Sequence, residues 1–129
     1  MRRIVSTDDA PAPMGAYSQG TETDDLVFTA GQMAVTPEGD MLTDAAMGVQ
    51  TRQTLENIEA ILEAADAGMG DILKVTVYLD DMDDFDAMNE AYEVYEAFFE
   101  ADPPARSAIA VDGLYDGAGV EIEAVATKG

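Results

Sequence analysis

The chain has 129 residues, with neither cysteine nor histidine, and 27 acidic against 6 basic residues give it a formal net charge of −21. The length suits one domain, residues 1–129, that buries a single core. Without Cys and His the chain has no disulfide and no Cys-His or Ser-His-Asp nucleophile, and a zinc hydrolase is not expected because His and Cys supply most zinc ligands. Any chemistry must therefore use carboxylates, guanidinium groups, hydroxyls, backbone groups and water.

The acidic residues are spread over the whole chain instead of forming a tail. A negative field of this kind repels phosphate backbones and anionic lipids, so we expect no nucleic acid and no membrane as partners. No apolar stretch has the length of a signal-peptide core or of a membrane span. The sequence therefore predicts a cytoplasmic protein.

The same dispersed charge predicts a halophilic protein from an acidic proteome, because such a surface is one way in which proteins stay soluble in concentrated salt. We expect the protein to be more stable against unfolding at high salt than in dilute buffer. Unfolding followed across a salt series measures this. Greatest stability in dilute buffer would contradict the interpretation.

The first part of the chain has short runs that are typical of strands. Residues 2–5 and residues 15–21 are expected to be short extended segments, and residues 26–30 form a β-type run. Gly31 follows directly, and a glycine in a strand often marks a bulge or a close approach to a ligand. Residues 33–35 are expected to continue the strand beyond it.

From Thr43 to about Ala65 the pattern changes to helical spacing. Thr43 is placed to cap the first turn of this helix, and Gly68 and Gly70 are expected to stop it. The apolar positions that recur at intervals of three and four are Leu55, Ile58, Leu62 and Ala65.

A central strand is predicted next, and a second helix begins near Asp83 or Asp84 and ends before Pro103. In the strand, apolar and β-branched residues alternate with Lys74, Thr76 and Tyr78; the buried positions are expected to be Leu73, Val75, Val77 and Leu79. The buried stripe of the helix is predicted to consist of Phe85, Met88, Tyr92, Tyr95 and Phe99.

Two strands, residues 106–111 and 120–127, are predicted to close the chain. In the last strand, Glu121 and Glu123 share one face and the apolar residues the other. The element order β-β-β-α-β-α-β-β predicts an α+β fold, with a mixed sheet of five or six strands and both helices on one face. The uncovered face carries Val and Thr as well as Glu, which favours a second subunit there and hence a homo-oligomer.

Arg106 directly follows the rigid segment Pro103-Pro104-Ala105 and enters a strand. A guanidinium group binds a carboxylate through two parallel hydrogen bonds, so Arg106 is a candidate receptor for a small anion. The alternative is an ordinary ion pair with one of the many local carboxylates, and composition alone favours this alternative.

Glu121 is expected near Arg106, on the neighbouring strand, where its carboxylate could orient a water molecule. The alternative is a solvent-facing Glu in an acid-rich protein. Tyr17 could cover a pocket or simply pack, and Asn89, next to Met88, could cap the helix or contact water. Residues 81–86 lack the glycine and the ligand set of a calcium loop, so we expect no metal.

Taken together, six short motifs resemble the RidA (YjgF) family of enamine/imine deaminases. They cover essentially the whole chain in order: residues 15–20 (GAYSQG), 29–32 (TAGQ), 53–58 (QTLENI), 75–79 (VTVYL), 104–107 (PARS) and 120–124 (VEIEA). Each motif alone is weak, and their combination is specific.

This resemblance implies a chorismate-mutase-like α+β fold assembled as a homotrimer, with clefts between the subunits. It also implies hydrolysis of 2-imino or enamine acids, such as 2-iminobutanoate and 2-iminopropanoate (2-aminoacrylate), to 2-oxo acids and ammonia without metal or cofactor. Family members have also been described as nucleases or translation inhibitors, and the charge of −21 disfavours that role here.

By the same resemblance, each candidate residue receives a role in an imine-binding cleft. The expected roles are a substrate-carboxylate clamp for Arg106, positioning of water for Glu121, lining of the cleft for Tyr17 and Asn89, and backbone contacts to the substrate around Gly31 and Ala108. Ala30 and Ala108 depart from the Ser and Cys that many members carry, which could alter substrate preference or rate.

A non-catalytic sensor or interaction protein that binds small carboxylates in the same clefts is the alternative function. The pairing of Arg106 with Glu121 disfavours it, because a carboxylate beside an anionic ligand weakens binding.

Overall fold

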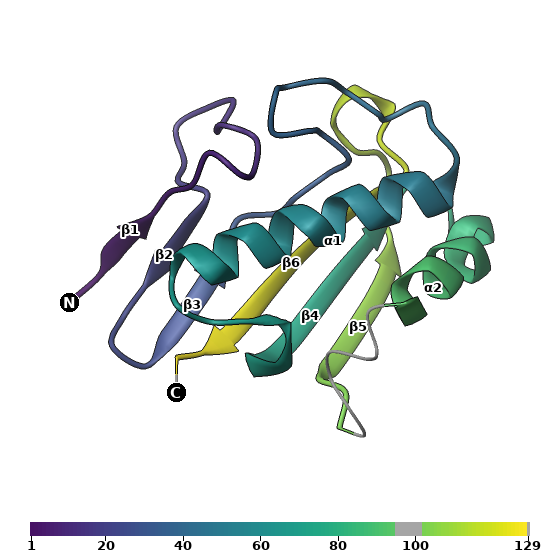
Figure 1. Ribbon diagram of the computed structural model, residues 1–129. Coiled ribbons are helices and arrows are strands. Elements are labelled where there is room, and N and C mark those ends of the chain that lie inside the picture. Colours follow the sequence, from purple (N-terminus) through teal and green to yellow (C-terminus); the bar gives the residue numbers. More distant parts are fainter. Residues whose placement is uncertain (95–101, 129) are drawn as a thin grey trace.

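The structure is a computed structural model that describes residues 1–94 and 102–128. Figure 1 shows a six-stranded sheet with α1 lying diagonally across one face and α2 beside it, close to β5. The strands are β1 (Arg3–Val5), β2 (Gly20–Glu22), β3 (Leu26–Thr29), β4 (Ile72–Leu79), β5 (Ala105–Ala110) and β6 (Val120–Thr127), and the helices are α1 (Met47–Ala64) and α2 (Phe85–Glu93). The predicted element order and the mixed sheet with helices on one face are confirmed.

The strand order is β1-β2-β3-β6-β4-β5, so the last strand of the chain lies in the middle of the sheet. Among the described strands, only β4 and β5 pair in parallel, because the segment that contains α2 crosses back over the sheet between them. The other edge of β4 pairs with β6, in the antiparallel direction. The expectation that Arg106 and Glu121 lie on neighbouring strands is therefore wrong, since β4 separates β5 from β6.

Alternation along β6 and β4 divides the sheet into a core face and an open face. Val120, Ile122 and Ala124 are buried under the helices, as predicted. In β4, the expected buried position Leu73 is wrong, because its side chain is 50% exposed. The register against β6 shifts between Ile72 and Lys74, so Ile72 takes the first core position of this strand.

Helix α1 begins at Met47, four residues later than its predicted start, and Thr43 does not cap it. The Thr43 hydroxyl instead donates a hydrogen bond of 2.9 Å to a carboxylate oxygen of Asp116. The helix also ends before the glycines that were expected to stop it, and Asp66 already has a left-handed φ of 60°. Its core face packs onto the sheet as the spacing predicts, through Leu55, Ile58 and Leu62.

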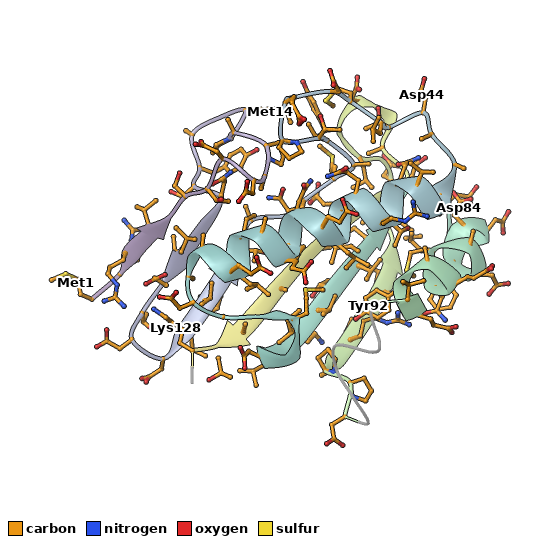
Figure 2. All side chains as sticks on the ribbon, in the orientation of Figure 1. Met1, Met14, Asp44, Asp84, Tyr92 and Lys128 are labelled. Carbon is orange, nitrogen blue, oxygen red and sulfur yellow. The ribbon has the colours of Figure 1, made fainter. Side chains whose placement is uncertain are left out.

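Helix α2 packs beside α1 over β5, and Figure 2 labels Tyr92 there. Its predicted buried stripe is confirmed for Met88 and Tyr92, which belong to the main core, whereas Phe85 is partly buried and packs against that core. Tyr95 and Phe99 fall outside the described residues. In the described part of the chain, no helix has the length and apolar character needed to cross a bilayer.

No described helix covers the opposite face of the sheet. The register places Tyr78, Glu121 and Ile109 in one row across this face, and Phe28 beside Val125 in another. Phe28 and Ile109 are 43% and 46% exposed. Exposed apolar groups and carboxylates thus share this face. That a second subunit covers it stays a prediction.

Candidate active site

A hollow of about 440 Å³ lies beside Glu121 at the end of the sheet where β6 begins. Its walls come from four separate segments of the chain: the loop between β1 and β2, the residues after β3, the turn before β6, and β6 itself. The lining residues are Met14, Tyr17, Ala30, Gly31, Met33, Tyr115 and Glu121. Three of the predicted site residues, Tyr17, Gly31 and Glu121, thus share one hollow.

The backbone at Gly31 lies directly against the side chain of Glu121. A Cβ atom at position 31 would be 2.5 Å from Oε2 and 2.9 Å from Cδ of Glu121, closer than real Cβ contacts allow. The segment is held there by a two-way bridge, in which the N–H groups of Gln32 and Ile122 donate to each other's carbonyl oxygens at 2.8 and 2.9 Å. The sequence predicts that Gly31 marks a bulge or a close approach to a ligand; the group that it approaches is this carboxylate, and β3 ends at Thr29 without continuing past it.

Replacing Gly31 with Ala should displace the Glu121 carboxylate while leaving the fold intact. The new methyl group would meet the far end of a flexible side chain, so the side chain moves instead of the backbone. If Glu121 acts in a reaction, a misplacement of about 1 Å predicts a loss of activity of up to about a hundredfold. Activity and thermal unfolding of the Gly31→Ala variant measure the two effects, and an unchanged rate would separate Gly31 from the chemistry.

Burial raises the pKa of the Glu121 carboxyl, and the nearby negative charge of Glu123 raises it further. Glu123 itself accepts a hydrogen bond from the Tyr78 hydroxyl, and this bond raises the pKa of Tyr78. A carboxyl with a raised pKa exchanges protons closer to neutral pH than an ordinary Glu does. Among the described residues, no group of three or more acidic side chains is placed to hold a metal ion.

Arg106 lies on the other face of the sheet. Its strand partner Val75 belongs to the core, and its guanidinium carbon sits 4.6 Å from the ring centre of Tyr92 and 5.9 Å from that of Phe85. Aromatic rings hold a guanidinium group in place without neutralising its charge. Arg106 forms no ion pair within residues 1–94 and 102–128, so an ordinary ion pair with a local carboxylate is not found there.

The six predicted site residues therefore form two groups. Ala108 shares a face of β5 with Arg106, and Asn89 lies on the neighbouring α2, where its amide donates to Glu93 at 3.1 Å. This group lies on the helix-covered side, whereas the Glu121 group lies on the open side. A single chain does not bring Arg106 and Glu121 together.

Residues 7–128 match the sequence profile of the family described as Endoribonuclease L-PSP, which includes RidA and YjgF. The chain belongs to the RidA (YjgF) family. A RutC family protein of Pyrococcus horikoshii is 44% identical over 128 residues, 99% of both chains. The 2-iminobutanoate/2-iminopropanoate deaminase of Escherichia coli K12 is 40% identical over 129 residues, again 99% of both.

Solved structures of RidA-family proteins have the same fold as this chain. Escherichia coli TdcF with bound serine superposes with a TM-score of 0.92 at 38% identity and covers 98% of this chain and 99% of its own. The agreement confirms the family resemblance and is consistent with the expected chorismate-mutase-like fold. The relatives carry different functional names, from deaminase to putative endoribonuclease, so the family alone does not select one activity.

Two buried amides support the hollow of this RidA-family chain, and the sequence analysis assigned no role to either. Gln19 bonds the loop that carries Tyr17: its Nε2 donates to the carbonyl oxygens of Thr7 and Pro11 at 3.0 and 2.9 Å, and its Oε1 accepts from the Thr7 N–H at 2.7 Å. Because Gln19 replaces backbone partners in a loop without regular structure, it fixes where Tyr17 lies.

Asn57 holds the segment after β3 in place, as Gln19 holds the loop that carries Tyr17. Its Nδ2 donates to the carbonyl oxygens of Met33 and Val35 at 3.2 and 2.8 Å, and its Oδ1 accepts from Gln53 at 2.9 Å. The signal in the sequence is an amide next to Ile58 on the apolar side of a helix, where an uncompensated polar group is costly. Such a residue needs specific hydrogen-bond partners. Here these are carbonyl groups of the segment that contributes Met33 to the hollow.

Proposed function

We propose that this protein hydrolyses 2-imino acids and their enamine tautomers to 2-oxo acids and ammonia, 2-iminobutanoate and 2-iminopropanoate among them. The observation that carries the proposal is the Glu121 carboxylate, which has a raised pKa and lies against Gly31 in a hollow of about 440 Å³. The deaminase name of relatives at about 40% identity supports it. The proposed bond changes use the Glu121 carboxylate, water and the substrate.

Hydrolysis of the C=N bond needs one proton acceptor that also returns the proton. The water oxygen bonds to C2, the water gives a proton to Glu121, and the C=N electron pair moves to nitrogen, which takes that proton. The hydroxyl of the resulting carbinolamine then gives its proton to Glu121. Nitrogen takes this proton as the C–N bond breaks, ammonia leaves, and C2 becomes the carbonyl of the 2-oxo acid.

The substrate also carries a carboxylate, which Glu121 would repel unless a cation binds it. Arg106 is suited to this role, because its planar guanidinium is held on rings and not in an ion pair among the described residues. Since Arg106 and Glu121 lie on opposite faces of one sheet, we propose a homotrimer in which Arg106 of one copy binds the substrate in the Glu121 hollow of the next. The exposed apolar groups of the open face fit burial against such a neighbour.

The test couples a threonine dehydratase, which releases 2-iminobutanoate, to lactate dehydrogenase in the presence of semicarbazide. Added protein should lower semicarbazone formation and speed the appearance of 2-oxobutanoate, at low or high salt. The same assay with heat-unfolded protein is the control. No suppression at any salt concentration by a folded trimer would contradict deamination and favour the small-carboxylate sensor.

A further inference from the structure

The turn before β6 carries Tyr115, an aromatic residue to which no role has been assigned so far. Its side chain is 65% exposed and lines the same hollow as Tyr17 and Glu121. An exposed aromatic ring that lines a hollow beside a carboxyl offers apolar area for contact with a ligand. Tyr115 therefore lies where it can contact a ligand in the hollow.

Hydrogen bonds hold the turn that contains Tyr115 in place. The next two residues, Asp116 and Gly117, have left-handed φ angles of 55° and 68°, and the Asp116 carboxylate is fastened by the Thr43 hydroxyl at 2.9 Å. On the other side, Ala118 is fully buried, and its N–H donates to the carbonyl oxygen of Tyr115 at 3.1 Å. Figure 1 shows the loop before α1 and the loop before β6 side by side at this end of the sheet. The fixed turn keeps the ring at the wall of the hollow.

Two methionines also line the hollow. Met14 and Met33 contribute thioether chains, which adjust to differently shaped partners. The hollow's volume of about 440 Å³ lies in the range of about 300–1,000 Å³ found for pockets that take drug-sized ligands. An imino acid with three or four carbons has a side chain of only one or two carbons, whereas a larger apolar side chain would displace water from the Met and Tyr side chains of the wall, which is favourable.

We propose that Tyr115, together with Met14 and Met33, forms a subsite for the side chain of the substrate and selects 2-imino acids with large apolar or aromatic side chains. This inference rests on the proposed function, because it places the reacting carbon at Glu121 and the side chain against Tyr115. Tyr115 acts as a specificity residue, and Thr43 is the positioning residue that fastens its turn through Asp116. The reaction at C2 is unchanged.

Binding of the 2-oxo acid products tests the subsite separately from turnover. In titration calorimetry of the folded trimer, phenylpyruvate should bind at least about tenfold more tightly than pyruvate, since one methylene group in a fitted pocket already contributes about tenfold. Tyr115→Ala should reduce this ratio of dissociation constants by about tenfold, and Tyr115→Phe should keep it. Met82→Ala removes an exposed apolar side chain outside the hollow and serves as the matched control.

Turnover gives the second readout, with an L-amino acid oxidase producing 2-imino acids from phenylalanine or alanine and semicarbazide trapping them. Thr43→Val, which keeps the side-chain volume and loses the bond to Asp116, should raise KM for the phenylalanine-derived imine and leave kcat within about threefold. An equal affinity for phenylpyruvate and pyruvate, or an unchanged ratio in Tyr115→Ala, would overturn the subsite. Tyr115-dependent binding without any turnover would retain the subsite and overturn the proposed deamination instead.

Discussion

Replacing Glu121 with Gln should lower kcat by about 10²–10⁴-fold, because the amide neither accepts a proton from water nor returns one to the leaving nitrogen. The shape of the hollow is nearly unchanged and the repulsion of the substrate carboxylate is removed, so KM should stay the same or fall. The folded-state pKa of Glu121 is raised, which means that its ionised form is disfavoured by folding at neutral pH. The variant should therefore unfold at the same temperature or at a higher one at pH 7, and kinetics with thermal unfolding measure both effects.

The neighbouring Glu123 provides the matched variant for this experiment. Its charge raises the pKa of Glu121, so Glu123→Gln should move the acidic limb of the pH–rate profile to lower pH. The amide oxygen can still accept the hydrogen bond from Tyr78. Two outcomes would contradict a role of Glu121 in the proton transfers. One is a Glu121→Gln variant that keeps kcat within about threefold, and the other is an acidic limb that does not move in Glu123→Gln.

Replacing Arg106 with Ala should lower kcat/KM by at least about a hundredfold while assembly remains intact. A charge-assisted hydrogen bond contributes about 1.5–3 kcal/mol, and the guanidinium group would lose two of them to the substrate carboxylate. The loss should appear first in KM, which steady-state kinetics with size-exclusion chromatography separates from a change in assembly. Arg52→Ala removes the same charge from the exposed side of α1 and should leave the rate unchanged. Retained activity in Arg106→Ala would refute the clamp.

Mixing the two inactive chains tests whether the site is shared between copies. In a cyclic trimer that contains both Arg106→Ala and Glu121→Gln chains, one boundary joins an intact Glu121 to an intact Arg106. Chains unfolded together in equal amounts and refolded should therefore regain about a quarter of wild-type activity. No regain from a mixed trimer would contradict a site that takes Glu121 from one copy and Arg106 from the next.

Patterns of a few residues are sufficient to predict most elements of this chain. The alternation in 120–127 identified both faces of β6, and the helical spacing of Leu55, Ile58 and Leu62 identified the core face of α1. Such patterns succeed because burial follows the period of each element. They fail at the ends of elements, as at Thr43, whose hydroxyl finds a partner 73 residues away instead of capping the helix.

The chemistry of the candidate residues was also readable from the sequence. Arg106 stands out because cations are scarce, and Glu121 because it alternates with buried residues. Gly31 stands out because glycine permits a close approach, and the atom that approaches is the carboxylate of Glu121 itself. Residue type and local spacing are enough to single out these residues, whereas the contact between Gly31 and Glu121 is known only from the structure.

Only the tertiary structure decided which of these residues meet. Insertion of β6 between β3 and β4 separates Arg106 from Glu121, and pairing of distant strands is not encoded in any local pattern. The hollow depends on the same long-range contacts, since it joins Tyr17, Gly31 and Tyr115 from three loops that buried amides and the Thr43–Asp116 bond hold together. The sequence by itself determined the elements and the reactive groups, whereas packing between distant segments determined the site.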